Sequence, residues 1–121
     1  MKNNCLSHLA DEALMAEVLR LARDERAAVV QLITHLAEVD KRALHLKAGH
    51  ASLYTYCRAV LCFSEPEAYV RMKAARAVRR YPRILGMLAD GSLNLTTLRL
   101  LIPRLRACNH ESLLAAAAGK S

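Results

Sequence analysis

A tyrosine and several basic side chains lie between positions 69 and 83, and side chains of these types can bind a polyanion. If residues 65–80 form a helix, with about 3.6 residues per turn, one face of it is basic and carries an aromatic ring: Tyr69, Lys73, Arg76 and Arg80. A second face is apolar: Val70, Ala74, Ala77 and Tyr81. Basic side chains bind phosphate groups, and a tyrosine among them can stack on a base or form a hydrogen bond. With the neighbouring Arg79 and Arg83, this basic face is a candidate nucleic-acid-binding site.

Two interpretations of the basic face remain open. In the first, the face contacts nucleic acid; in the second, the segment is an ordinary pair of packed helices with a solvated basic surface. Glu65 and Glu67 stand at the start of the helix, the part that a helix-turn-helix protein inserts into the major groove. Because two acids there repel phosphate, we expect weak contacts to the DNA backbone with little sequence preference.

The charge distribution also favours a polyanionic partner. The 121 residues carry a formal net charge of +7. Residues 1–40 hold four basic and seven acidic side chains, whereas residues 41–121 hold fourteen basic and four acidic ones. Segment 71–106 carries nine bases against one acid. Such asymmetry is typical of proteins that bind nucleic acid, although a highly soluble surface has the same composition.

No other motif carries a complete chemistry. His45, His50, Cys57 and Cys62 are close in sequence, but their spacing matches no zinc finger or zinc knuckle, so we expect no metal site. The segment 119–121 resembles the end of a phosphate loop without its upstream glycine. Neither a nucleophile elbow nor a paired-carboxylate motif occurs. We therefore expect no catalytic residue, no cofactor, no small-molecule substrate, and no cleavage of DNA by this chain.

The elements that position these residues are predicted to be helices. Hydrophobic residues make up 54% of the chain and are mostly Leu and Ala, whereas aromatic residues make up 4%. This composition favours helices over strands and a shallow layer of packed helices over a thick core. The length fits one domain, residues 1–121. The predicted fold class is all-α, with five or six helices and short connections.

The first helix is predicted from about Asp11 to about Leu46. One apolar stripe with helical spacing runs along it: Leu14, Val18, Leu21, Ala28, Leu32, Leu36, Val39 and Ala43. A stripe of this length must pack against something. We expect it to pack on the later helices or on the same helix of a second copy, in a homodimer.

A short helix, a turn and a longer helix are predicted over residues 52–80, the outline of a helix-turn-helix. Ser52 is the expected N-cap of the short helix. Ser64 and Glu67 have the spacing of a capping box at the start of the longer one, which Pro82 ends.

Three shorter helices are expected after Pro82. The first spans residues 83–89, and the second begins at Thr96 or Thr97. The last spans residues 111–118, with Asn109 as its cap.

Neither a signal peptide nor a membrane-spanning segment is visible. The N-terminus has no apolar run of signal-peptide length, and no stretch of about 18 uncharged apolar residues occurs. The four cysteines form no Cys-x-x-Cys pair, so we expect reduced thiols that pack as small hydrophobic groups. These observations predict a cytoplasmic protein without a membrane partner.

Five segments in combination resemble a known family. They are Leu36-Ala-Glu-Val-Asp-Lys-Arg-Ala-Leu-His-Leu, Gly49-His-Ala-Ser-Leu-Tyr-Thr-Tyr-Cys, Leu61-Cys-Phe-Ser-Glu-Pro-Glu-Ala-Tyr, Ala74-Ala-Arg-Ala-Val-Arg-Arg-Tyr-Pro and Leu88-Ala-Asp-Gly-Ser-Leu-Asn-Leu-Thr. From about Leu9 to Ser121, the chain resembles the helical N-terminal region of a group of bacterial HNH-endonuclease-type proteins.

In that family the nuclease motif lies in a separate C-terminal part, where His and Asn residues surround a metal, often near paired Cys-x-x-Cys motifs. This chain has no such part, so the resemblance transfers no catalytic residue. It implies a helical accessory domain for DNA engagement or self-association. A truncated reading frame or a fragment of a two-part protein is the expected explanation for the missing nuclease half.

Overall fold

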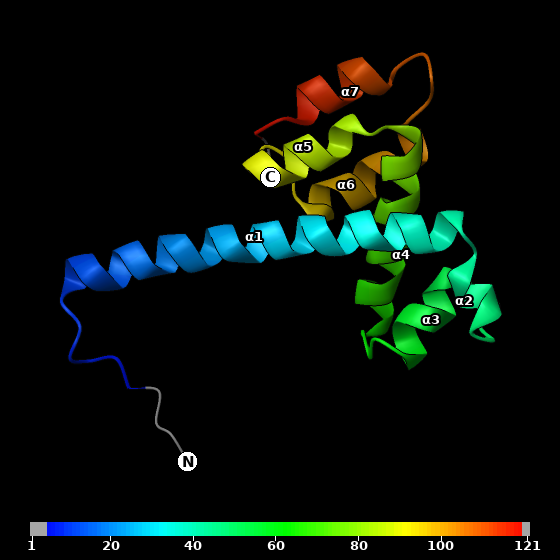
Figure 1. Cartoon of the computed structure of the whole chain (residues 1–121). Coiled ribbons are helices and arrows are strands. Elements are labelled where there is room, and N and C mark those ends of the chain that lie inside the picture. Colours follow the sequence, from blue (N-terminus) through cyan, green and yellow to red (C-terminus); the bar gives the residue numbers. More distant parts are fainter. Residues whose placement is uncertain (1–4, 120–121) are drawn as a thin grey trace.

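The computed structural model describes residues 5–119, and this part of the chain is helical without strands (Figure 1). Its elements are α1 (Asp11–Lys41), α2 (Leu44–Lys47), α3 (Leu53–Ala59), α4 (Glu65–Arg80), α5 (Arg83–Asp90), α6 (Leu95–Leu101), the 3₁₀ helix η1 (Ile102–Arg104) and α7 (His110–Ala117). The predicted all-α class is confirmed. The predicted number of five or six helices is wrong, because residues 5–119 contain seven α-helices. None of them is long and apolar enough to cross a membrane.

The additional helix arises because the first helix ends earlier than predicted. α1 ends at Lys41 rather than near Leu46. Ala43 then adopts a left-handed backbone with φ of 55°, which is strained for a residue with a Cβ atom. α2 leaves in a new direction and buries His45 (Figure 1). No glycine or proline marks this break, so tertiary packing rather than local preference determines it.

The caps predicted for the middle of the chain are confirmed. At the start of α4, the Ser64 N–H donates to Glu67 Oε1 at 2.9 Å, and the Glu67 N–H donates to Ser64 Oγ at 3.3 Å. Ser52 and Thr55 form the equivalent box at the start of α3. α4 ends at Arg80, where Pro82 predicted its end.

The start of α6 differs from the prediction. α6 begins at Leu95 rather than at Thr96 or Thr97, and Asn94 is its N-cap. Asn94 Oδ1 accepts the Thr97 N–H at 2.8 Å. Asparagine caps helices at least as well as threonine does, so the earlier residue takes the position.

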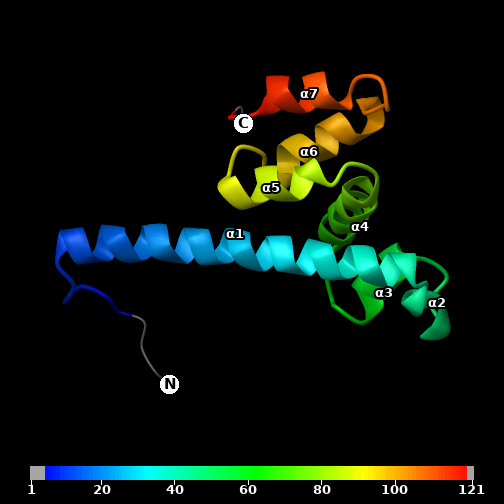
Figure 2. The ribbon, with the colours of Figure 1, turned by 45° about the horizontal axis from the view of Figure 1, so that its top comes forward.

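α4 lies at the centre of the fold and packs against α1, α3, α5 and α6. α1 crosses α4, with α5, α6 and α7 on one side of α1 and α2 and α3 on the other (Figures 1 and 2). Two hydrophobic clusters result. One joins α1 and the second half of α4 to α5, α6 and α7 through Ile33, Ala74, Ala77, Val78, Tyr81, Ile84, Leu88, Leu93, Leu98, Leu105 and Leu114. The other joins α1 and residues 68–75 of α4 to α3 through Leu36, Ala37, Leu53, Cys57, Ala68, Met72 and Ala75.

The two halves of α1 have different surroundings. Its buried residues, Ile33, Leu36 and Ala37, all lie in its second half. Its first half extends away from the other helices (Figures 1 and 2). Large apolar side chains there are more than half exposed: Met15, Val18, Leu19 and Leu21. The expected packing of α1 on later helices is thus found for its second half alone.

Candidate nucleic-acid interface

A basic strip of α4 remains on the surface of an otherwise well-covered helix. Tyr69, Arg76 and Arg80 are exposed, and Lys73 is half-buried. We call these four residues the ridge. The Lys73 ammonium lies over the Tyr69 ring, 5.5 Å from its centroid, so the two side chains form one basic and aromatic surface. The structure therefore brings together the four residues that the helical spacing predicted on one face.

An acid of α1 occupies one edge of the ridge. Asp40 Oδ2 accepts a hydrogen bond from Arg79 Nη1 at 2.7 Å, and Asp40 Oδ1 lies 3.7 Å from Arg76 Nε. The Asp40 side chain is only 10% exposed, while those of Arg76 and Arg79 are 48% and 43% exposed. Two of the predicted site residues thus hold α1 against α4, and their charge is partly neutralised.

The other edge of the ridge is a groove between α4 and the segment formed by α6 and η1. It has a volume of about 240 Å³ and is lined by Tyr69, Lys73, Arg99, Ile102 and Pro103. Cations therefore stand on both walls, Lys73 on α4 and Arg99 on α6. Sequence spacing along one helix could not identify Arg99; its only signal was membership of the basic segment 71–106.

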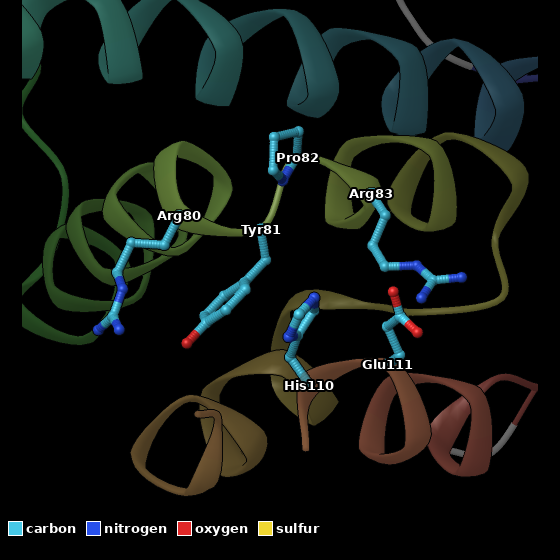
Figure 3. A pocket seen from close by; sticks show the side chains of 6 residues that line it. All are labelled: Arg80, Tyr81, Pro82, Arg83, His110 and Glu111. Carbon is cyan, nitrogen blue, oxygen red and sulfur yellow. The ribbon is translucent and has the colours of Figure 1, made fainter. Parts of the chain in front are cut away.

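The ridge ends at a pocket between the start of α5 and the start of α7 (Figure 3). The pocket measures about 390 Å³ and is lined by Arg80, Tyr81, Pro82, Arg83, His110 and Glu111. We call it the end pocket. The Tyr81 and His110 rings stack with centroids 4.6 Å apart, and the Arg80 guanidinium lies 5.3 Å from the Tyr81 centroid. Arg80 and Arg83 of the predicted set meet here, joined by a histidine that the spacing did not indicate.

Other cations of the basic segment face the protein. The Arg71 guanidinium lies over the Phe63 ring, 4.9 Å from its centroid. Arg106 Nη1 donates to the carbonyl oxygens of Pro103 and Leu105 at 3.0 and 2.9 Å. The charge available to a ligand is therefore smaller than the sequence count of nine bases.

The acids at the start of α4 have distinct positions. The Glu67 carboxylate accepts the Ser64 N–H of the capping box, and this hydrogen bond lowers the pKa of Glu67 below its ordinary value. Glu65 lines a shallow hollow that also contains Tyr69 and Arg99. α3, the turn and α4 have the predicted order, but α1, α5 and α6 also cover α4, so insertion of α4 as a helix-turn-helix remains a prediction.

The histidine and cysteine residues form no group in residues 5–119 that could hold a metal ion. Cys57 is fully buried, and this burial raises the pKa of its thiol. Cys5, Cys62 and Cys108 are exposed. Lys120 and Ser121, part of the segment that resembles a phosphate loop, lie outside the described residues.

Comparison with protein-family models, with curated proteins and with solved structures found no match to this chain. The structure itself defines an all-helical fold whose surface carries a basic ridge, a groove with cations on both walls and an end pocket.

Proposed function

We propose that this chain is a non-catalytic helical module that binds the DNA backbone weakly and with little sequence preference. The observation that carries the proposal is the groove beside the ridge, where Lys73 and Arg99 line a shared space from two different helices, together with Tyr69 beside Lys73. Within residues 5–119, neither cation has an ion-pair partner, unlike Arg76 and Arg79. Unpaired cations are the ones that can replace counterions on phosphate.

The length of the ridge agrees with a phosphate track. Lys73 and Arg80 are seven residues apart on α4, which corresponds to about 10 Å at about 1.5 Å per residue. Successive phosphates of one DNA strand advance by about 3.4 Å along the duplex axis and are farther apart along the winding strand itself, so a ridge of this length spans neighbouring phosphates. Contacts of this kind give affinity without reading the base sequence. The resemblance to the N-terminal regions of HNH-type endonucleases supports the same proposal.

The test is fluorescence anisotropy on a random-sequence duplex over a salt series. The triple variant Lys73→Glu, Arg80→Glu, Arg99→Glu should lose at least about tenfold in affinity and lower the salt slope by about three, since each lost phosphate contact removes about 0.9. Circular dichroism checks that the variant stays folded.

A charge-matched control separates the site from the net charge. Lys41, Lys47 and Arg58 are exposed cations outside the ridge and the groove. Changing these three to Glu alters the net charge equally, and the affinity should fall much less. Equal losses in both triple variants, or no binding by the parent at low salt, contradict the proposal.

The exposed first half of α1 favours a second function, assembly with another copy of the chain. Its exposed apolar side chains lie on a helix segment that no other described element covers. Asp11 and Glu12 stand at the start of this segment, and Arg23 and Arg26 stand near its end. Asp24 and Glu25 lie between these arginines, so charge does not select an orientation, and the exposed apolar area alone carries this proposal.

Where α1 leaves the body of the fold, a mainly apolar notch of about 200 Å³ lies beside it. The notch is lined by Glu25, Arg26, Val29, Leu88, Leu93, Asn94 and Leu95. It can receive an apolar side chain from the start of the second copy's α1.

The assembly proposal is tested by light scattering after size exclusion. Val18→Asp should halve the mass, because it places a charge in the paired face. Ala16→Asp, on the opposite side of the same helix, should leave the mass unchanged. A monomeric parent at high concentration contradicts assembly and leaves DNA binding untouched.

A further inference from the structure

The end pocket combines several features that favour an anion. Arg80 and Arg83 supply guanidinium groups, and His110 contributes an imidazole. Figure 3 shows Arg80 and Tyr81 on one side of the pocket, Arg83 and Glu111 on the other, and His110 between them. Two separate elements, the α4–α5 junction and α7, therefore line one pocket, in which Arg83 extends toward Glu111 and Arg80 lies on the far side of Tyr81 (Figure 3).

Two helices also begin at this pocket. Arg83 is the first residue of α5 after Pro82, and His110 is the first residue of α7. The N-terminus of a helix carries a partial positive charge and unpaired N–H groups, which suit phosphate. Neither start has a side-chain cap, but in α5 the Ile84 and Leu85 N–H groups already donate to the Tyr81 and Pro82 carbonyl oxygens at 3.0 and 3.1 Å.

Asn109 explains why the start of α7 is uncapped. It occupies the N-cap position, where the sequence predicted a cap, but its side chain accepts the N–H of Arg106 at 2.7 Å and donates to the carbonyl of Arg104 at 3.1 Å. The predicted capping role of Asn109 is therefore wrong, because the turn before α7 uses its side chain. The His110 N–H donates to the Arg106 carbonyl oxygen at 2.9 Å, so no more than the Glu111 and Ser112 N–H groups of the first turn of α7 are left for a ligand.

An unsatisfied tyrosine hydroxyl is an independent sign of a ligand. Tyr81 lines the end pocket and is only 6% exposed, yet its hydroxyl has no hydrogen-bond partner among the described residues. Buried hydroxyl groups nearly always have a partner, because leaving one unpaired is unfavourable. The exposed Arg80 side chain covers the ring, so a small movement of Arg80 can admit a ligand oxygen to this hydroxyl.

His110 is held so that one ring nitrogen faces away from its own chain. Its Nδ1 atom lies 3.1 Å from the Ala107 carbonyl oxygen and 3.3 Å from that of Arg106, so Nδ1 carries a hydrogen and donates to them. In the neutral ring Nε2 is then an acceptor, so it can take a hydrogen bond from the P–OH group of a singly protonated phosphate monoester. The stacking of His110 on Tyr81 fixes the orientation of both rings.

We propose that the end pocket binds a phosphate monoester and that, in the DNA-binding function on which this assignment rests, it holds the terminal 5′-phosphate of a strand. Arg80 belongs to both the ridge and the pocket, so a strand that follows the ridge reaches the pocket at its end. A terminal phosphate has more negative charge and more free oxygens than a backbone phosphate, so it can contact several of the groups that line this pocket. Glu111 opposes it and limits the affinity.

The experiment compares two otherwise identical single strands, one with a 5′-phosphate and one with a 5′-hydroxyl, by fluorescence anisotropy with the full chain. The parent should bind the 5′-phosphate strand about tenfold more tightly, the gain expected for one charge-assisted hydrogen bond. Arg83→Ala should remove this preference, whereas Glu111→Gln should increase it. Arg99→Ala is the control: it should weaken both strands equally and leave their ratio unchanged.

Inorganic phosphate distinguishes this assignment from the proposed function. Phosphate should raise the melting temperature of the parent at constant ionic strength, and it should do so less for Arg83→Ala. If phosphate raises the melting temperature in this way and DNA does not bind, the phosphate-binding assignment of the end pocket is supported and the DNA-binding function is contradicted. If DNA binds with no preference for the 5′-phosphate strand, the terminal-phosphate assignment is overturned while the function stands. If phosphate has no effect on the parent, the pocket itself is overturned.

Discussion

Asp40 has a structural role and an electrostatic role, and one substitution tests both. It joins α1 to α4 through Arg79 and Arg76, and it neutralises two cations at the edge of the ridge. Asp40→Asn keeps the size of the side chain and removes its charge. The variant should therefore be less stable than the parent and, if the ridge binds DNA, should bind DNA more tightly.

The size of the stability loss follows from the geometry. The 2.7 Å contact with Arg79 is a hydrogen bond between charged groups, a kind that contributes about 1.5–3 kcal/mol. Because both arginine side chains are nearly half exposed, water solvates them once the carboxylate is gone, and the lower value of about 1.5 kcal/mol applies. For a domain of 121 residues this lowers the melting temperature by about 6 °C.

The size of the binding gain follows from counterion release. Arg76 and Arg79 become available to phosphate when Asp40 loses its charge. Each new phosphate contact steepens the dependence of log affinity on log salt by about 0.9, so the slope should grow by up to about two. Anisotropy over a salt series and thermal unfolding by circular dichroism measure the two effects on the same samples.

Glu38→Gln is the matched control. It removes one negative charge from the same turn of α1, but its ion pair with Arg42, at 2.7 Å, is exposed on both sides. Exposed pairs of this kind contribute little, so the melting temperature and the salt slope should barely change. Equal stability of Asp40→Asn and Glu38→Gln would contradict the structural role of Asp40, and equal salt slopes would contradict its neutralising role.

Three further results are expected. Ser64→Ala should destabilise the protein by about 1 kcal/mol, because it removes the Oγ acceptor at the start of α4, and urea unfolding measures this loss. The pKa of Glu67 is lowered in the folded protein, so its contribution to stability is present above the ordinary glutamate pKa and is lost as the pH falls through the lower folded value. The urea midpoint of Glu67→Gln should therefore fall less than that of the parent in this acidic range. Equal pH profiles of the two proteins would contradict the capping box. A thiol reagent should modify the exposed Cys5, Cys62 and Cys108 quickly. Burial raises the pKa of Cys57, so Cys57 should react at the rate of unfolding. Rapid reaction at all four positions would show that the hydrophobic cluster around Cys57 is open to the reagent.

The caps and chain breaks were the most predictable parts of the fold. Ser52, Ser64 and Pro82 mark helix boundaries through hydrogen bonds and steric contacts within four residues of themselves, so their types and spacing are sufficient. The break at Ala43 was not predictable in this way. A left-handed alanine is locally unfavourable, and it persists because the packing of α2 and the burial of His45 require it.

The candidate site was predictable only along one helix. The period of α4 placed Tyr69, Lys73, Arg76 and Arg80 on one face, and the structure confirms that they share it. The state of each charge depends on neighbours distant in sequence. Arg76 meets Asp40, which no pattern within α4 could indicate.

By itself the sequence determined the helical class, the positions of most helix ends and the basic face of α4, because these depend on composition and on interactions within one or two helical turns. Only the tertiary structure decided which cations are available. The crossing of α1 over α4 neutralises Arg79 with Asp40, the packing of α6 beside α4 adds Arg99 to the groove, and the position of α7 places His110 against Tyr81. The physical reason is that electrostatic and stacking interactions depend on distance in space, and distance in space between separate helices is set by how their apolar faces pack.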